Sequence, residues 1–167
     1  MASEGPMRAS FDRLDRRLLA CLQENNLQTA DRLAEQVGRS PSAVARRLRR
    51  LRASGAIAAE TAVLSEDAAG QPLSAIVQVQ LERHAPQAAD LLRRRLIASG
   101  NVQLCLDVSG AFDILLLIVA ADMDAYNDFA DAMLAEQPAV RRFETSFVKK
   151  RAKATLAVPL EELMRGP

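Results

Sequence analysis

The chain has 167 residues, of which 49% are hydrophobic and 26% charged. This composition is typical of a protein that folds around a core in water, and it excludes an intrinsically disordered chain. The longest apolar run, residues 114–121, is far shorter than the ~20 residues that span a bilayer, and no secretory signal pattern is present. Cys21 and Cys105 lie inside segments with regular apolar spacing, so we expect buried free thiols rather than a disulfide. Free thiols fit a reducing compartment. We therefore expect a cytoplasmic protein that does not bind membranes.

The net charge of +1 conceals an uneven distribution of charged residues. Residues 8–55 contain eleven arginines and five acidic residues, a net charge of +6. Residues 56–167 contain eleven basic and fifteen acidic residues, a net charge of −4. A basic first part joined to an acidic second part indicates that the first part binds a polyanion, and the alternative is a charged face that only meets solvent.

The first part of the chain contains three predicted helices. Apolar residues recur at helical spacing over residues 12–24, 30–37 and 41–53. Thr29 and Ser40 are of the type that caps a helix N-terminus, Pro41 suits the first helical position, and Gly38 supplies the left-handed residue at which a helix ends. Two helices joined by a short turn with glycine form a helix-turn-helix motif, whose second helix enters the major groove of DNA.

The arginine-rich third helix is the predicted DNA-reading element. If Val44 points inward, a rotation of about 100° per residue points these side chains outward: Ser42, Arg46, Arg49 and Arg50. Residues near the start of such a helix read bases, and residues further along bind phosphate. Arg46 is therefore predicted to bind guanine, with Ser42 and Ala43 at base edges. The predicted phosphate ligands are Arg47, Arg49 and Arg50.

The rest of the chain predicts an α+β domain. Alternating and apolar segments indicate strands over residues 73–81, 102–109, 112–120 and 142–148, with helices that begin at Pro86 and after Asp122. This βαββαβ order is that of a ferredoxin-like sandwich, in which both helices cover one face of an antiparallel sheet. Residues 112–120 are apolar on both faces, so we expect a second copy to cover the other face in a homodimer.

The predicted domain boundaries follow from these elements. Residues 1–10 form a flexible arm, 11–57 a helix-turn-helix (winged-helix-like) domain, 58–72 a linker with a short strand at 61–64, 73–160 the ferredoxin-like domain and 161–167 a tail.

No enzyme, cofactor or metal site is predicted. The single histidine, His84, has no cysteine or carboxylate cluster at metal-ligand spacing and is expected to be a solvated loop residue. Asp122 and Asp124 lie near a helix N-terminus, where the helix dipole explains them. No nucleophile elbow, P-loop or dinucleotide fingerprint is present.

From residue 11 to 160 the chain resembles the leucine-responsive/asparagine-operon (Lrp/AsnC) family of transcriptional regulators. The resemblance is carried by the segments LDRRLL (14–19), LAEQVG (33–38), SPS (40–42), RRL (46–48), GAI (55–57), GAFDILL (110–116), DMDAY (122–126) and TSFV (145–148). It implies binding to pseudo-palindromic double-stranded DNA, dimers that often assemble into octamers, and a small effector, usually an amino acid, bound between dimers.

The resemblance also implies where the effector binds. The family's effector loop corresponds to Ser109, Gly110, Ala111, Phe112 and Asp113. Gly110 would let the backbone approach a ligand, and Asp113 would receive an ammonium group. The alternative is that Gly110 only makes the hairpin turn and Asp113 caps the strand.

The chain departs from the family pattern in two places that concern binding. An acidic residue is common where this chain has Ala111. Arg39 replaces the usual apolar residue after the turn glycine and adds a possible phosphate contact.

Two further functions compete with an effector-modulated, sequence-specific regulator. The first is a tetrapyrrole-processing enzyme, because some such enzymes (sirohaem decarboxylases) resemble this family in both domains. Such chemistry needs histidine or other cofactor-binding groups, and His84 is the only histidine in the sequence. The other is an architectural DNA-binding protein without an effector.

Overall fold

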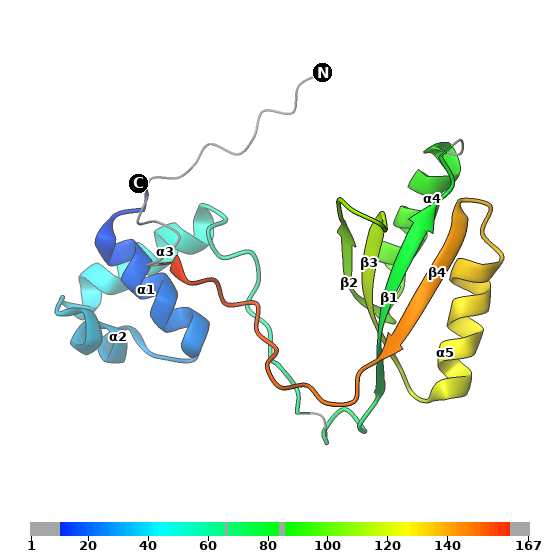
Figure 1. The fold of residues 1–167 in the computed structure, drawn as a ribbon. Coiled ribbons are helices and arrows are strands. Elements are labelled where there is room, and N and C mark those ends of the chain that lie inside the picture. Colours follow the sequence, from blue (N-terminus) through cyan, green and yellow to red (C-terminus); the bar gives the residue numbers. More distant parts are fainter. Residues whose placement is uncertain (1–10, 66, 84–85, 161–167) are drawn as a thin grey trace. The chain divides into compact units, whose positions relative to one another are not determined.

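We describe a computed structural model of the chain, in which residues 11–65, 67–83 and 86–160 are described. The expected arm (1–10), the expected tail (161–167) and His84 lie outside the described residues. The described residues divide into two compact units: the first comprises residues 11–62 and 154–160, and the second lies within Val63–Lys153. Figure 1 shows a helical unit and a unit with a sheet, which we describe separately.

The first unit is a bundle of three helices, α1 (Arg13–Glu24), α2 (Ala30–Val37) and α3 (Pro41–Ala53). These are the predicted helices to within one residue at each end. Their apolar faces meet in a core that comprises Leu18, Leu19, Leu22, Leu33, Ala34, Val37, Val44, Leu48 and Leu51. The helix-turn-helix prediction is therefore confirmed, and α2 and α3 hold each other through buried apolar contacts.

Caps fix where the helices begin and end. The Thr29 and Ser40 side chains accept hydrogen bonds from the first turns of α2 and α3, as predicted. Gly38 ends α2 with φ +67°, the left-handed conformation that a glycine adopts without strain. At α1, Asp12 and Asp15 form a reciprocal capping box that the sequence analysis missed.

The first unit also contains a segment from the far end of the chain. Val158 N–H donates to the Gln23 side-chain oxygen over 2.7 Å, and the Gln23 amide donates to Val158 O over 3.1 Å. Leu160 packs against the helical core. Residues 154–160 thus belong to the DNA-binding unit, whereas the sequence analysis assigned them to the ferredoxin-like domain. Apolar spacing could not reveal this, because the paired residues are 135 positions apart.

The second unit is an antiparallel four-stranded sheet with two helices. Its elements are β1 (Leu73–Leu81), α4 (Pro86–Ala98), β2 (Val102–Asp107), β3 (Ile114–Ala120), α5 (Met123–Ala130), the π-helical turn η1 (Asp131–Ala135) and β4 (Val140–Phe147). The strand order is β2-β3-β1-β4, which with this element order is the predicted ferredoxin-like fold. Asp122 caps α5 as predicted, through a 2.8 Å bond from Ala125 N–H.

One face of the sheet is covered by the helices and forms the core. Alternate residues of β1 and β3, including Val77, Val79, Leu116 and Ile118, pack against Leu92 and Leu96 of α4 and Phe129 and Leu134 of the α5–η1 region. The opposite residues of β3 are only half-buried in the single chain. The apolar second face of β3 therefore has no cover within the described part of the second unit.

Three expectations need correction or refinement. Residues 61–64 form no strand, because no neighbouring segment pairs with them in the described part of the chain. β3 begins at Ile114 rather than residue 112, since residues 109–113 form the connection from β2. Cys21 and Cys105 are free thiols as predicted, but they are half-buried rather than buried.

Among the described residues, no helix is both long and apolar enough to span a membrane.

Candidate nucleic-acid interface

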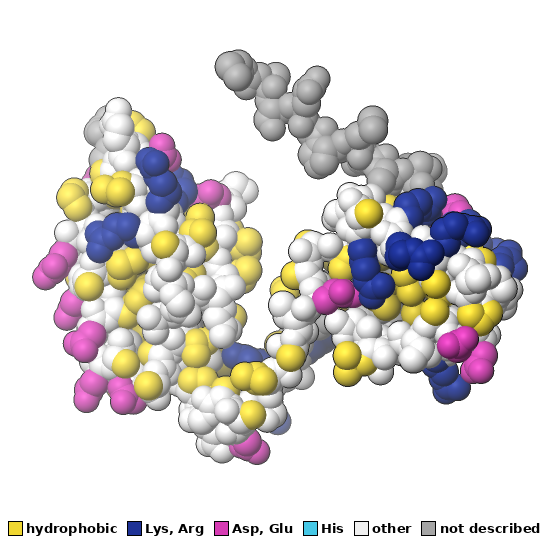
Figure 2. All heavy atoms as spheres, turned by 180° about the vertical axis from the view of Figure 1, so that it is seen from behind, with side chains coloured by type: hydrophobic (Ala, Val, Ile, Leu, Met, Phe, Trp, Pro, Cys, Tyr) yellow, Lys and Arg dark blue, Asp and Glu magenta, His cyan; other side chains and the backbone are white. Residues whose placement is uncertain are grey.

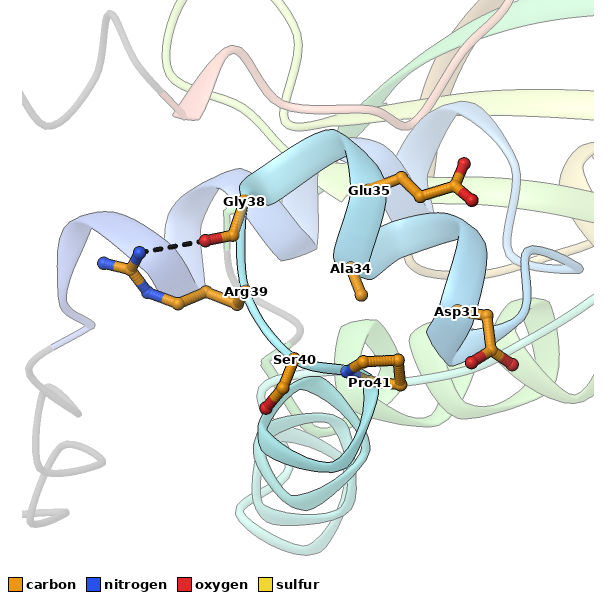
Figure 3. A pocket seen from close by; sticks show the side chains of 7 residues that line it. All are labelled: Asp31, Ala34, Glu35, Gly38, Arg39, Ser40 and Pro41. Atoms are coloured by element: carbon orange, nitrogen blue, oxygen red, sulfur yellow. Dashed lines mark hydrogen bonds between the residues drawn. The ribbon is translucent and has the colours of Figure 1, made fainter.

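The turn between α2 and α3 fixes how the recognition helix projects from the bundle. In Figure 3, Ala34 of α2 lies over Pro41 at the start of α3, so the side chain at the point where the two helices come close to each other is a small one. Asp31 and Glu35 line the outer side of the same shallow hollow, and the Arg39 guanidinium donates to Gly38 O over 3.0 Å. The hollow is wide open to solvent and flanked by two carboxylates, which makes it a poor site for an anion.

The outward face of α3 carries the predicted reading residues. Ser42, Arg46 and Arg49 are exposed, and Ala43 is half-buried. Neither the Arg46 side chain nor the Arg49 side chain forms an ion pair or hydrogen bond with any residue in the described part of the chain. Their guanidinium groups are therefore available for an external acceptor, and the bidentate geometry of guanidinium matches both guanine and phosphate.

Two other arginines of α3 are engaged inside the protein. Arg47 donates to Asp12 over 2.5 Å and to Asp15 over 2.9 Å. Arg50 donates to the other carboxylate oxygen of Asp15 over 2.5 Å. The sequence analysis predicted both as phosphate ligands and pointed Arg50 outward. Arg50 instead turns its guanidinium to α1, because a buried carboxylate lies within its reach.

Arg52, at the end of α3, forms an ion pair of 2.9 Å with Glu60. The five arginines of the helix are thus of two kinds: three are paired with acids of the same unit, and two face solvent. Sequence reasoning missed the pairing with Asp15 because Asp15 is 32 and 35 positions from Arg47 and Arg50. The only signal was the presence of Asp12 and Asp15 three residues apart at the start of a basic segment.

The capping box and the ion pairs together shift the pKa values of Asp12 and Arg47. The Asp15 backbone N–H donates to the Asp12 carboxylate and lowers the pKa of that carboxyl, and the Arg47 guanidinium lowers it further. The carboxylates of Asp12 and Asp15 in turn raise the pKa of Arg47. Figure 2 shows dark blue basic side chains gathered on the helical unit and magenta acidic side chains along one edge of the other unit.

The predicted effector loop connects β2 to β3. Val108 N–H donates to Asp113 O, and Asp113 N–H donates to Val79 O, both over 2.9 Å. One carboxylate oxygen of Asp113 accepts the Leu81 N–H over 2.8 Å. Asp113 therefore has the strand-capping role that the sequence analysis kept as an alternative, while its second oxygen accepts no hydrogen bond from a described residue.

The tip of the loop is open. Ser109, Gly110 and Ala111 are exposed, and a Cβ added to Gly110 would meet no atom within 4 Å. Phe112 is half-buried, and the Arg142 guanidinium lies 5.4 Å from the centre of its ring. The loop thus combines free backbone at Gly110 with a cation–π pair at Phe112.

The face of the sheet away from the helices is apolar at its centre. Ile76 of β1 pairs with Leu117 of β3, and Leu115 of β3 pairs with Leu106 of β2. Ile76 is 40% and Leu106 45% exposed. We call this surface the bare sheet face; its central residues are Ile76, Leu104, Leu106, Leu115, Leu117 and Val119.

Comparisons with known families agree with both units. Residues 11–58 match the winged helix-turn-helix DNA-binding family, and residues 74–158 match the Lrp/AsnC ligand binding domain. An uncharacterised HTH-type transcriptional regulator of Sinorhizobium fredii is 39% identical over 151 residues, which cover 90% of this chain and 89% of that protein. The leucine-responsive regulatory protein of Escherichia coli is 32% identical over 143 residues, 86% of this chain and 87% of that protein.

Solved structures show the same similarity. A transcriptional regulator of Neisseria meningitidis, determined in complex with L-Met, is 31% identical with a TM-score of 0.86 and covers 93% of this chain and 100% of its own. An AsnC family regulator of Agrobacterium tumefaciens is 27% identical with a TM-score of 0.84, over 92% of this chain and 100% of its own. These relatives are regulators rather than enzymes. The chain therefore belongs to the Lrp/AsnC family of helix-turn-helix transcriptional regulators.

Proposed function

We propose that this regulator reads DNA with the first two turns of α3, where Arg46 binds guanine and Ser42 and Ala43 contact neighbouring base edges. The observation that carries the proposal is that Arg46 and Arg49 are exposed and form no ion pair with any described residue. Arg49, one turn further along, binds phosphate. Arg47 and Arg50 contribute less, since they are paired with Asp15.

We propose further that two copies pair through the bare sheet face, which presents two α3 helices to a pseudo-palindromic site. Half-sites would then lie about one helical turn, or a multiple of it, apart. A contiguous apolar face that is half-exposed in the single chain supports this pairing, because isolated proteins rarely leave such a surface open to water.

The proposed effector is a small amino acid bound at residues 109–113. Two features support it: the backbone at Gly110 is open, and the Asp113 oxygen that is not bonded to Leu81 N–H is available to an ammonium group. The Neisseria relative was determined with an amino acid. An architectural DNA-binding protein without an effector is the competing function for this unit.

Selection of bound DNA from random sequence, followed by anisotropy titrations, tests the reading role. Arg46→Ala should weaken binding by about 1–3 kcal/mol on the selected site and relax the preference at one base position. Arg49→Ala, the matched control on the same helix face, should weaken all sequences alike and reduce the salt dependence. Equal loss on all sequences for Arg46→Ala would remove it from the reading role.

Thermal denaturation in the presence of each of the twenty amino acids tests the effector. A ligand at 100 times its Kd should stabilise the protein by about 2.7 kcal/mol. Asp113→Asn should abolish this gain while keeping an acceptor for Leu81 N–H, and Asp128→Asn, on the exposed side of α5, should keep the gain. A panel with no stabilising amino acid would favour the architectural function.

A further inference from the structure

Among the described residues of the DNA-binding unit, Asp15 is the most deeply buried charged side chain, with 1% of its surface exposed. It lies in the first turn of α1, yet its two carboxylate oxygens bind two different arginines of α3. One oxygen accepts from Arg47 over 2.9 Å and the other from Arg50 over 2.5 Å. The second oxygen also accepts the Asp12 N–H over 3.3 Å. All of these groups come from the recognition helix or from the start of α1.

A buried carboxylate is costly unless cations and hydrogen bonds compensate its charge. Here two guanidinium groups supply the compensation, and Arg47 is also bound by Asp12 over 2.5 Å. Two acids therefore neutralise two of the arginines of α3. The guanidinium groups themselves are only partly withdrawn from water, since the side chains of Arg47 and Arg50 are 29% and 59% exposed.

The spacing of the two arginines gives the contact a second consequence. Arg47 and Arg50 are three residues apart, so they lie on the same side of α3 in successive turns. Both bind the same carboxylate. A rotation of α3 about its axis, or a shift along it, would break at least one of the two ion pairs, and the orientation of Arg46 therefore depends on Asp15.

We propose that Asp15 is a positioning residue that sets the DNA selectivity of this regulator. It fixes the rotation of α3 and keeps Arg47 and Arg50 from binding phosphate, which leaves Arg46 and Arg49 as the free cations of the helix. Phosphate contacts bind every sequence alike, so arginines held inside the protein lower non-specific affinity more than specific affinity. The proposal rests on the proposed reading role of α3.

Asp15→Asn is the decisive substitution, because asparagine keeps the shape and one acceptor but removes the charge. We expect tighter binding to random DNA and a smaller ratio of specific to non-specific affinity. The slope of log affinity against log salt should steepen by about 0.9 for each arginine released to phosphate. Arg47 keeps its ion pair with Asp12 in this variant, so Arg50 is the arginine that is released. Raising salt from 50 to 200 mM would then cost the variant about 3.5-fold more affinity than it costs the unsubstituted protein.

Asp12→Asn is the matched control. Asparagine still caps α1, and only one of the two ion pairs of Arg47 is lost, so the change in salt slope should be clearly smaller. If Asp15→Asn instead weakens specific and random DNA in the same proportion, with an unchanged salt slope, Asp15 has only a structural role and the proposal is overturned.

A second pair of variants tests the proposal without changing Asp15, and it decides the matter if Asp15→Asn fails to fold. Arg49→Gln should reduce the salt slope by about 0.9, whereas Arg50→Gln should leave it nearly unchanged. Equal reductions would show that Arg50 binds phosphate despite Asp15 and would overturn the proposal. Failure of the proposed function is a distinct result: Arg46→Ala would then leave base preference intact while these salt slopes still differed.

Discussion

The recognition helix and the bare sheet face are both exposed surfaces, but different physical rules decide which of their side chains are available to a partner. On α3, charge pairing decides which arginines are free: Arg47, Arg50 and Arg52 have acidic partners, and Arg46 and Arg49 do not. On the sheet, the alternation of the pleat decides, since every second residue of β3 faces the helices. Which arginines can bind a polyanion therefore depends on acidic residues that are distant in the sequence. Which residues form the apolar face depends only on the alternation of the strand itself.

The largest effect is expected where a charge enters the bare sheet face. Ile76→Glu would bury an unpaired carboxylate twice in each dimer, which should weaken the dimer by about 3–5 kcal/mol or more, at least a hundredfold in Kd. Sedimentation velocity across a dilution series measures this. Ile97→Glu, on an α4 residue that is 70% exposed, should leave the dimer intact. If Ile76→Glu also leaves it intact, the copies do not pair through this face.

An intermediate effect is expected where the C-terminal segment joins the helical unit. Leu160→Ala removes apolar contact with the helical core and should lower the free energy of unfolding of that unit by about 1 kcal/mol. Leu156→Ala, four residues earlier and 94% exposed, should change it little. Urea denaturation followed by helical circular dichroism compares the two. Equal stabilities would mean that Leu160 does not contribute to this core.

The smallest effect is expected from titration of Asp12. Its folded-state pKa lies below the ordinary value of 3.8, so the carboxylate contributes stability above that value. The contribution is lost as pH falls through the lowered folded pKa. Asp12→Asn should therefore be less stable than the unsubstituted protein near neutral pH, and the two should converge in acid. Acid titrations of unfolding free energy measure this, and curves that stay parallel below pH 3.8 would contradict it.

Much of the fold could be predicted because its signals are local. Thr29, Gly38 and Ser40 fix the helix-turn-helix through bonds and backbone angles within a few residues, and Asp122 does the same for α5. The alternation over residues 73–81 predicted a strand, and β1 spans these residues. The strand expected at residues 61–64 was wrong, since a strand also needs a partner that its own residues do not specify.

The sequence by itself determined the order of elements, the family, and an arginine cluster on a helix that begins at Pro41. Only the tertiary structure decided which of those arginines are free, because Asp15 reaches Arg47 and Arg50 across more than thirty residues of chain. It also placed Val158 and Leu160 on the helical unit. The physical reason is the same in both cases: caps and periodicity act over one or two turns, whereas ion pairs and apolar contacts depend on which distant segments the folded chain brings together.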